Sequence, residues 1–126
     1  MISFSVMDAS ISSFAGTVPK EYEICYPQDE AAVKSTDDMW WALLAKKTGS
    51  KIICIDAYSG SRISETGTLP AWPACISDRR IARLKGTAVI VFGGTNDFGQ
   101  RDSDAAPLSV FQDAYATLIK KCAVLA

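Results

Sequence analysis

Three residues of this chain, Ser10, Gly60 and Asn96, are of types that together can carry out acyl transfer. A serine hydroxyl can attack a carbonyl carbon, and a backbone N–H and a side-chain amide can stabilise the oxyanion that forms. Each residue lies a few positions beyond an apolar run, in a segment rich in small and hydrogen-bonding residues. Acyl transfer is therefore possible if the fold brings these three segments together.

The apolar runs before these residues indicate β-strands, and helical patterns alternate with them. This alternation predicts one α/β domain over residues 1–126, with a parallel sheet and right-handed crossovers. Ile52–Ile55 is continuously apolar, as is typical of a parallel strand covered on both faces. Open parallel sheets bind ligands beyond the carboxyl ends of their strands, where Ser10, Gly60 and Asn96 are expected. Strands are predicted over 2–7, within 51–60 and within 87–94, and helices over 36–48, within 77–86 and from 107 onwards.

The clearest helix is predicted over residues 36–48, with Ser35 or Thr36 as its cap. Aspartates in its first turn and lysines in its last turn both suit the helix dipole, and Gly49 is placed to end it. Of the pair Trp40–Trp41, one indole is expected in the core and the other half-exposed, with a sugar site as the alternative. The side predicted to face the core consists of Trp40, Leu43, Leu44 and Lys47.

The composition is that of an ordinary globular domain, since 48% of the 126 residues are apolar and 21% are charged. The formal net charge of −1 offers no electrostatic case for binding nucleic acid or an anionic membrane. No apolar run approaches the roughly 20 residues that span a bilayer, and the first residues lack the pattern of a signal peptide. A cytoplasmic protein and a secreted protein in its mature form both fit this sequence.

The chain contains no histidine, which removes the commonest general base of enzymes. Its four cysteines are widely spaced, include no CxxC pair and are expected to be buried or partly buried free thiols. Without histidine or paired thiols a zinc site is not expected. No metal or organic cofactor is implied.

The segments DASISSFAG, WWALLA, YSGSRIS, SDRRIARL and VIVFGGTNDFG together resemble the SGNH/GDSL hydrolase family, over nearly the whole chain. The last segment is the most specific, because Gly-x-Asn-Asp after an apolar strand is far more discriminating than a lone serine. The resemblance implies a three-layer α/β/α flavodoxin-like fold and a serine esterase acting on acyl groups of sugars or lipids. It makes Ser10 the nucleophile, and gives the oxyanion hole to the backbone N–H groups of Ser10 and Gly60 and the amide of Asn96.

Two departures from the family pattern bear on activity. Ala9 stands where the opening block of the family has aspartate. The last family block, Asp-x-x-His, supplies the acid and base of the triad and is missing, so the chain is expected to be incomplete at its C-terminal end. A serine without its base is expected to lose about 10⁴- to 10⁶-fold in rate.

The missing C-terminal block also affects the predicted sheet. A complete family member would have about five parallel strands, whereas about three core strands are predicted here. The third strand would then present a long apolar edge, which isolated proteins usually avoid. A homo-oligomer or a partner chain is therefore expected to cover this edge.

Each central candidate also has a simpler structural interpretation. Ser10 could cap a helix, and Gly60 could occupy a plain turn, with or without a further role. Asn96 could form an Asx-turn with Asp97. The family resemblance favours the oxyanion role for Asn96.

Three more residues are candidates for substrate contact. Arg62 could bind an anionic group, unless it is a solvated surface arginine. Trp72 lies between two prolines in a loop near the strand ends, where it could contact a ligand. Asp97, next to the candidate oxyanion donor, is the third.

Two functions of different classes remain open. The first is a serine ester hydrolase that forms an acyl-enzyme on Ser10, impaired in this chain unless a partner or missing segment supplies an Asp–His pair. The second is a non-catalytic structural or binding subunit that reuses the fold, which Ala9 and the missing histidine favour. The retained SGS and GGTND loops favour the enzyme. A nucleotide-binding half-domain fits poorly, since GGTNDFG lacks GxGxxG spacing and no helix is predicted directly behind it.

Overall fold

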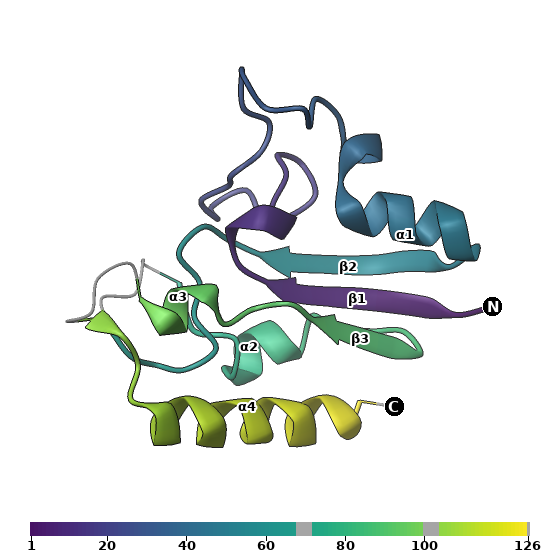
Figure 1. Cartoon of the computed structure of the whole chain (residues 1–126). Coiled ribbons are helices and arrows are strands. Elements are labelled where there is room, and N and C mark those ends of the chain that lie inside the picture. Colours follow the sequence, from purple (N-terminus) through teal and green to yellow (C-terminus); the bar gives the residue numbers. More distant parts are fainter. Residues whose placement is uncertain (68–71, 100–103, 126) are drawn as a thin grey trace.

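The computed structural model describes residues 1–67, 72–99 and 104–125, and within them it contains a three-stranded parallel sheet (Figure 1). The strand order is β2-β1-β3, with the first strand of the chain in the centre. The predicted α/β fold with about three parallel core strands is therefore confirmed. The strands are β1 (Ser3–Asp8), β2 (Lys51–Ala57) and β3 (Ala88–Val91).

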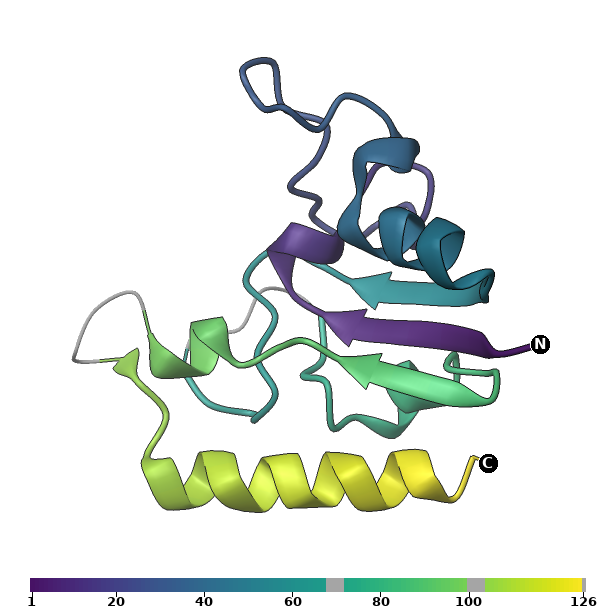
Figure 2. The same cartoon turned by 45° about the vertical axis from the view of Figure 1, so that its right-hand side comes forward.

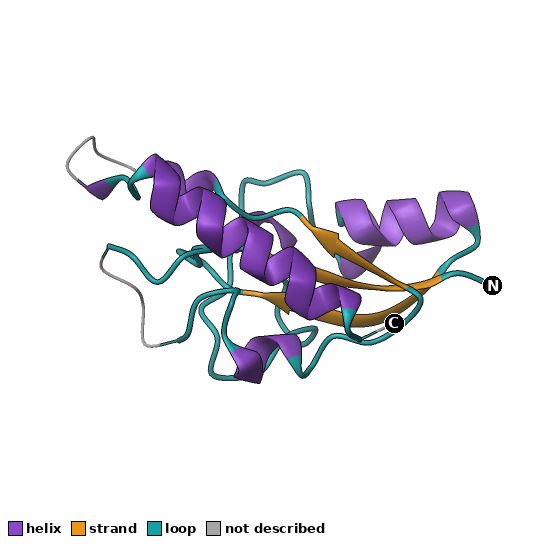
Figure 3. Ribbon diagram, turned by 90° about the horizontal axis from the view of Figure 1, so that it is seen from below, coloured by secondary structure: helices purple, strands orange, loops and turns teal. Residues whose placement is uncertain are grey.

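Helices cover both faces of the sheet, so the domain has three layers (Figures 1 and 2). Because β2 and β3 lie on opposite sides of β1, right-handed crossovers place successive helices on opposite faces. One face carries α1 (Trp40–Thr48), and the other carries α2 (Asp78–Ile81) and α4 (Leu108–Ala123). Figure 3, seen from below, shows α4 lying across the strands. The short helices are η1 (Ser10–Ser12), η2 (Thr36–Asp38) and α3 (Thr95–Phe98).

The central strand divides the hydrophobic core into two clusters. Val6 belongs to the cluster under α1, together with Trp41. Met7, the next residue, belongs to the cluster under α2 and α4, together with Leu118. Consecutive strand residues point to opposite faces, so β1 is buried on both sides.

The two outer strands of the described sheet differ from the prediction. Ile53 in β2 is 40% exposed, and only Ile55 and the two residues after it are buried in this strand. The predicted cover on both faces of Ile52–Ile55 is therefore wrong for the first half of β2, because β2 is an edge strand. β3 has only four residues, so its free edge is shorter than predicted.

The helix predicted over 36–48 is present but interrupted. Met39 has a ψ of 142°, an extended conformation that separates the 3-10 turn η2 from α1. Ser35 and Asp38 form a capping box in front of η2, and Gly49 ends α1 with a φ of 69°. The predicted start and stop are therefore confirmed, whereas the predicted continuity is wrong.

The side of α1 that faces the core also differs from the prediction. Trp41 is 4% exposed and belongs to the core, whereas Leu43, predicted to face the core, is 55% exposed. The Trp41 indole donates a hydrogen bond to the Ser12 carbonyl at 3.0 Å, so a contact remote in sequence sets the rotation of the helix. Trp40 is half-buried, which confirms that the two tryptophans divide between core and surface.

The two later helices begin where the sequence predicts. Ser77 caps α2 by accepting a hydrogen bond from the Arg80 N–H at 3.3 Å, and α4 starts directly after Pro107. The one-turn helix α3 is not predicted by the sequence, because the pair Gly93–Gly94 suggests only a loop. Gly94 has a φ of 123°, which a glycine adopts readily, and this turn lets the chain enter α3 directly after β3.

Candidate active site

The three loops that carry the candidate residues leave the sheet at the same end, where the carboxyl ends of the strands lie (Figures 1 and 2). η1 follows β1, residues 58–64 follow β2, and α3 lies beyond the end of β3. Parallel strands place their carboxyl ends together, so this arrangement follows directly from the alternation of strands and helices in the sequence.

Ser10 begins η1 and is half-buried. Its carbonyl accepts hydrogen bonds from the Ser13 N–H at 3.0 Å and from the Ser13 hydroxyl at 2.7 Å, which fix its backbone. Ala9 is the N-cap residue of η1, and no side chain caps this helix, so the capping interpretation of Ser10 is wrong. Within the described part of the chain the Ser10 hydroxyl has no hydrogen-bond partner.

Ser12 anchors the turn that begins at Ser10. Its hydroxyl donates to the carboxylate of Asp8 and accepts from the Trp40 indole N–H at 2.8 Å. Its carbonyl accepts from the Trp41 indole N–H at 3.0 Å. Both tryptophans of α1 therefore hold the loop after β1, a role that is not predicted from the sequence.

The Asp8 carboxyl lies at the end of β1, two residues before Ser10, and is 1% exposed. Burial raises its pKa above the ordinary value, because the charged form loses its hydration. Hydrogen bonds from the Ser12 hydroxyl and the Ala9 N–H, and the nearby charge of Arg80, act in the opposite direction on the pKa but are weaker. The carboxylate is therefore an unfavourable but hydrogen-bonded charge beneath the turn of Ser10.

Asp8→Asn is expected to remove a pH dependence of stability. A carboxyl whose pKa is higher in the folded state binds its proton more tightly when folded, so wild-type stability falls as the pH rises from the unfolded pKa through the folded one. The asparagine variant lacks this term, so its free energy of unfolding should improve relative to the wild type as the pH rises above about 4, the ordinary pKa of an aspartate. Urea titrations of both proteins across this range measure the difference. A difference that stays constant, or moves the other way, would contradict the raised pKa.

Asp97 joins the loop after β3 to the loop after β2. Its side chain is 2% exposed and accepts hydrogen bonds from the Ile63 N–H at 2.7 Å and the Ser64 N–H at 2.9 Å. The Ser64 hydroxyl donates to the same carboxylate at 2.6 Å. Asp97 therefore fixes the loop after β2 against the loop after β3. Its contact with a substrate stays a prediction.

The Asn96 side chain is fixed against the segment that carries Gly60. Its Nδ2 donates a hydrogen bond to the Ser61 carbonyl at 2.9 Å. Asn96 and Asp97 thus bind the neighbouring loop rather than their own, which contradicts the Asx-turn interpretation. Gly60 has a φ of 86°, so the turn interpretation of this glycine is confirmed, while its role as an oxyanion donor stays a prediction.

A fully buried arginine joins the strand ends beneath these loops. The Arg80 guanidinium donates to the Asp56 carboxylate at 2.7 Å and to the Ser61 hydroxyl at 2.6 Å. It also donates to the carbonyls of Asp8 and Asp56, each at 3.3 Å. Its carbon Cζ lies 4.5 Å from the centre of the Tyr58 ring, within the range of a cation–π contact. Arg80 therefore ties the ends of β1 and β2 to the loop that contains Gly60.

A second arginine completes this cluster. Arg83 donates to the other oxygen of the Asp56 carboxylate at 2.6 Å. This cluster is not among the features predicted from the sequence, although a signal was present: Asp56 is a charged residue at the end of an apolar strand, and a buried carboxylate requires a partner. Arg80 and Arg83 are three residues apart, a spacing that places both on one side of a helical segment.

Arg62 is buried rather than solvated, with 4% of its surface exposed. Its guanidinium donates to the Thr66 hydroxyl at 3.1 Å and to the Asp104 carbonyl at 2.7 Å, and it forms an ion pair with the Asp104 carboxylate. The surface interpretation of Arg62 is therefore wrong. The arginine braces the loop after β2 against the segment before α4, and binding of an anionic substrate stays a prediction.

Trp72 is half-buried beside an aromatic cluster near the end of β2. Its ring centre lies 5.6 Å from that of Tyr22, which in turn lies 5.1 Å from the ring of Tyr58. The Trp72 carbonyl accepts a hydrogen bond from the Tyr58 hydroxyl at 2.8 Å. Trp72 is thus held at the rim of the loop region, and contact between its indole and a ligand stays a prediction.

The structure brings two of the three central candidates together directly, since the Asn96 amide binds the residue after Gly60. Ser10 is connected to them through Arg80, which binds both the carbonyl at the end of β1 and the Ser61 hydroxyl. No hydrogen bond joins Ser10 to Gly60 or Asn96 among the described residues. The complete oxyanion hole therefore stays a prediction.

Within residues 1–67, 72–99 and 104–125, no three histidine, cysteine, aspartate or glutamate side chains form a group that could hold a metal ion. No helix there is long and apolar enough to cross a bilayer. The four cysteines are free thiols, with Cys75 buried and the other three partly buried, as the sequence predicts.

Comparison with known proteins gives one family. Residues 2–121 match the family described as GDSL-like lipase/acylhydrolase. A GDSL-like lipase from Bacteroides ovatus ATCC 8483 aligns with a TM-score of 0.78 and 24% identity, covering 97% of this chain. A GDSL-like lipase from Bacteroides uniformis ATCC 8492 aligns with a TM-score of 0.78 and 25% identity, covering 99% of this chain. No curated protein shows a significant match.

In both structural alignments this chain spans 66% of the other protein's length. The shared part includes the central parallel sheet and the loops at its carboxyl edge, because the alignments cover nearly all of this chain. Fold and family agree, and the chain belongs to the GDSL-like lipase/acylhydrolase family.

Proposed function

We propose that this domain is a serine ester hydrolase of the GDSL type in which Ser10 is the nucleophile. Family membership supports the reaction class. The Ser10 hydroxyl, which has no hydrogen-bond partner among the described residues and stands on a backbone fixed by Ser13, supports the choice of Ser10. The proposed substrate is a small acyl ester of a sugar or a lipid, and the reaction needs no cofactor.

The proposed reaction has two stages. The Ser10 oxygen attacks the ester carbonyl carbon, and the electron pair of the C=O bond moves onto oxygen to give the oxyanion. Collapse of this intermediate expels the alcohol, which takes up the proton that Ser10 lost, and leaves the acyl group on Ser10. Water then attacks the acyl carbonyl carbon, again through an oxyanion; the bond to the Ser10 oxygen breaks, the carboxylic acid leaves, and a proton from the water returns to Ser10. The proposed oxyanion donors are the backbone N–H groups of Ser10 and Gly60 and the Asn96 amide.

The observation that carries the proposal is the hydrogen bond from Asn96 Nδ2 to the Ser61 carbonyl. An amide NH₂ group has two hydrogens, so one remains for an oxyanion while the other fixes the orientation of the group. Asp97 supports this orientation by holding α3 against the same loop through three hydrogen bonds. Such preorganised donors are typically worth about 10²- to 10³-fold in rate.

The proton acceptor is the missing part of the reaction. The chain has no histidine, and the nearest carboxylate in sequence, Asp8, is buried and already accepts the Ser12 hydroxyl. A histidine base would therefore have to come from outside these 126 residues. The chain alone is expected to show only residual activity, about 10⁴- to 10⁶-fold below that of a complete triad.

Hydrolysis of an aryl acetate, with and without added imidazole, tests the proposal. Imidazole can replace the absent base, so the wild type should show a rate above the imidazole background, and Ser10→Ala should not. Asn96→Ala should lower the rescued rate by about 10²-fold, since one oxyanion donor is lost. Far-ultraviolet circular dichroism of each variant controls for loss of fold.

A non-catalytic structural or binding role is the second candidate, favoured by Ala9 in the opening block and by the absence of histidine. The two candidates give different results in the same experiment. Equal rates for the wild type and Ser10→Ala, with and without imidazole, would reject the hydrolase and leave the binding role.

A further inference from the structure

Every polar group of Ser61 is hydrogen-bonded, each to a different residue. Its N–H donates to the Tyr58 carbonyl at 3.2 Å, and its carbonyl accepts from Asn96 Nδ2 at 2.9 Å. Its hydroxyl accepts a hydrogen bond from the Arg80 guanidinium at 2.6 Å. Only 1% of Ser61 is exposed. Ser61 therefore joins the turn after β2 both to α3 and to the buried arginine of α2.

The bond between the Ser61 hydroxyl and Arg80 is the firmest of these contacts. Its donor is charged, which makes a hydrogen bond shorter and roughly twice as strong as one between neutral groups. Arg80 is itself held, because its Nε lies 2.7 Å from the Asp56 carboxylate and both side chains are fully buried. A serine side chain at the surface turns among its staggered rotamers, whereas this one is kept in a single orientation. The side chain thus fixes the backbone of Ser61.

The turn from Tyr58 to Ser61 carries the proposed backbone donor. It is closed by the hydrogen bond from the Ser61 N–H to the Tyr58 carbonyl. Gly60 is the third residue of this turn, and its φ of 86° is positive, as a type II turn requires at this position. The Gly60 N–H belongs to the central peptide of the turn, so its direction depends on both ends. Tyr58, which is fully buried, holds one end, and Ser61 holds the other.

The proposed side-chain donor depends on the same residue. The Ser61 carbonyl fixes one hydrogen of the Asn96 amide, and the planar amide group then sets the direction of the other hydrogen. The carbonyl and the side chain of Ser61 share one Cα atom, so a shift of this residue displaces the acceptor that orients Asn96. Both proposed donors therefore depend on the anchoring of one buried hydroxyl.

We propose that Ser61 is a positioning residue, through whose hydroxyl the buried Arg80 sets the directions of the Gly60 N–H and the Asn96 amide. The proposal rests on the oxyanion roles proposed above for Gly60 and Asn96. Ser61 acts on the reaction only through these two donors. Donors that are already directed at the oxyanion need no reorganisation when its charge develops, which is the source of their effect on rate.

Ser61→Ala, with nitrogen-15 relaxation of the Asn96 side chain, tests the proposal. Alanine keeps the N–H and the carbonyl of this position and removes only the hydroxyl. Arg80 keeps the Asp56 carboxylate and the Pro73 carbonyl, at 3.2 Å, as acceptors, so the variant should fold. The order parameter of the Asn96 amide should fall from about 0.85, typical of a rigid group, to below about 0.6. An unchanged order parameter would overturn the proposal.

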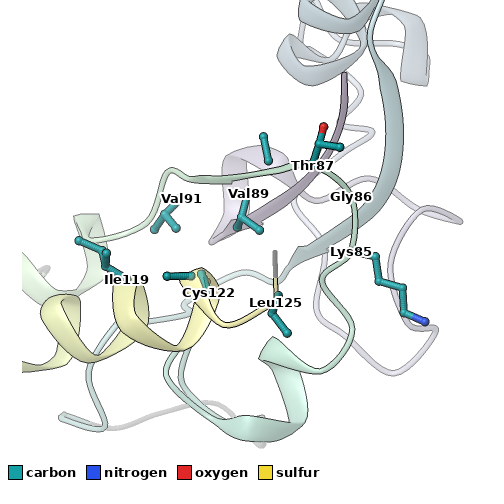
Figure 4. A pocket seen from close by; sticks show the side chains of 10 residues that line it. Lys85, Gly86, Thr87, Val89, Val91, Ile119, Cys122 and Leu125 are labelled. Carbon is teal, nitrogen blue, oxygen red and sulfur yellow. The ribbon is translucent and has the colours of Figure 1, made fainter. Parts of the chain in front are cut away.

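Two controls separate this effect from a general loosening. Ser59→Ala makes the same chemical change in the same turn, at a half-buried serine whose hydroxyl forms no hydrogen bond within the described part of the chain. Val89→Ala removes packing from the first half of β3, where Figure 4 shows Val89 beside the hollow of about 290 Å³ between β3 and α4. Both variants should keep the wild-type order parameter of Asn96. A loss in either control equal to that of Ser61→Ala would overturn the proposal.

Ser61→Thr and Ser61→Val form a second pair of variants, matched in volume. Both make the side chain larger, but only threonine keeps a hydroxyl that can accept from Arg80. Because strain from the added bulk is common to both, the order parameter of Asn96 should be higher in the threonine variant. Equal values would contradict a role of the hydroxyl, and this comparison holds even if Ser61→Ala does not fold.

Imidazole-rescued hydrolysis of an aryl acetate gives a kinetic measure of the same effect. Loosened donors stabilise the oxyanion less but leave binding of the ester unchanged, so Ser61→Ala should lower kcat about 10-fold and keep KM within about 2-fold. A raised KM with an unchanged kcat would contradict the proposal. Failure of the hydrolase itself is a separate result, seen as equal rates for the wild type and Ser10→Ala. The order parameter of Asn96 does not depend on catalysis and decides the role of Ser61 in either case.

Discussion

Replacing Arg80 with methionine is expected to lower the free energy of unfolding by about 3–5 kcal/mol. Methionine fills much of the same volume but donates no hydrogen bond. The variant leaves the Asp56 carboxylate buried with Arg83 as its remaining partner, and leaves the Ser61 hydroxyl without its charged donor. Breaking a buried ion pair from one side is costly because the remaining charge keeps its desolvation penalty.

Urea unfolding followed by tryptophan fluorescence measures this effect, with Arg79→Met as the matched control. Arg79 is the preceding residue in α2 and is exposed, so its replacement should change stability by no more than about 0.5 kcal/mol. If the two variants were equally stable, the buried cluster would not be what holds the strand ends together.

Replacing Asp97 with alanine should have the second largest effect, a loss of about 3–5 kcal/mol. The change removes the acceptor of three hydrogen bonds at once, those from the Ile63 N–H, the Ser64 N–H and the Ser64 hydroxyl. Each buried donor left without a partner costs about 1–3 kcal/mol. The loop after β2 and the helix α3 should separate as a result, so the neighbouring Asn96 should also lose its fixed orientation.

Thermal unfolding of Asp97→Ala beside Asp113→Ala checks this expectation. Asp113 lies on the exposed side of α4, so removal of its carboxylate should leave the midpoint nearly unchanged. Ser10→Ala provides a further comparison, because it removes the proposed nucleophile without touching the link between the loops. If Asp97→Ala were as stable as Asp113→Ala, the three hydrogen bonds would not be what secures the loops.

Much of the fold could be predicted from local patterns in the sequence. The alternation of apolar runs with helical segments predicts the parallel sheet, and the structure places strands at Ser3–Asp8, Lys51–Ala57 and Ala88–Val91. Ser77 and Gly49 mark helix ends in the sequence and do so in the structure. These features are predictable because periodicity and capping depend on residues only a few positions apart.

The candidate site was predictable only in outline. The loops after parallel strands must share one edge of the sheet, so the approach of Asn96 to the loop of Gly60 follows from topology. The hydrogen-bond partner of each side chain cannot be predicted from topology, because the bond from Asn96 to Ser61 joins residues 35 positions apart. The interaction of Ser12 with the two tryptophans, over 28 and 29 positions, could not be predicted for the same reason.

The sequence by itself thus determined the fold class, the family and the edge of the sheet at which the chemical groups gather. Only the tertiary structure decided the rotation of α1 about its axis, the burial of Arg80 between two strands, and the orientation of the Asn96 amide. Local propensities are summed over neighbouring residues and can be read along the chain. The burial and hydrogen bonding of a single polar side chain depend instead on groups that only folding brings within about 3 Å.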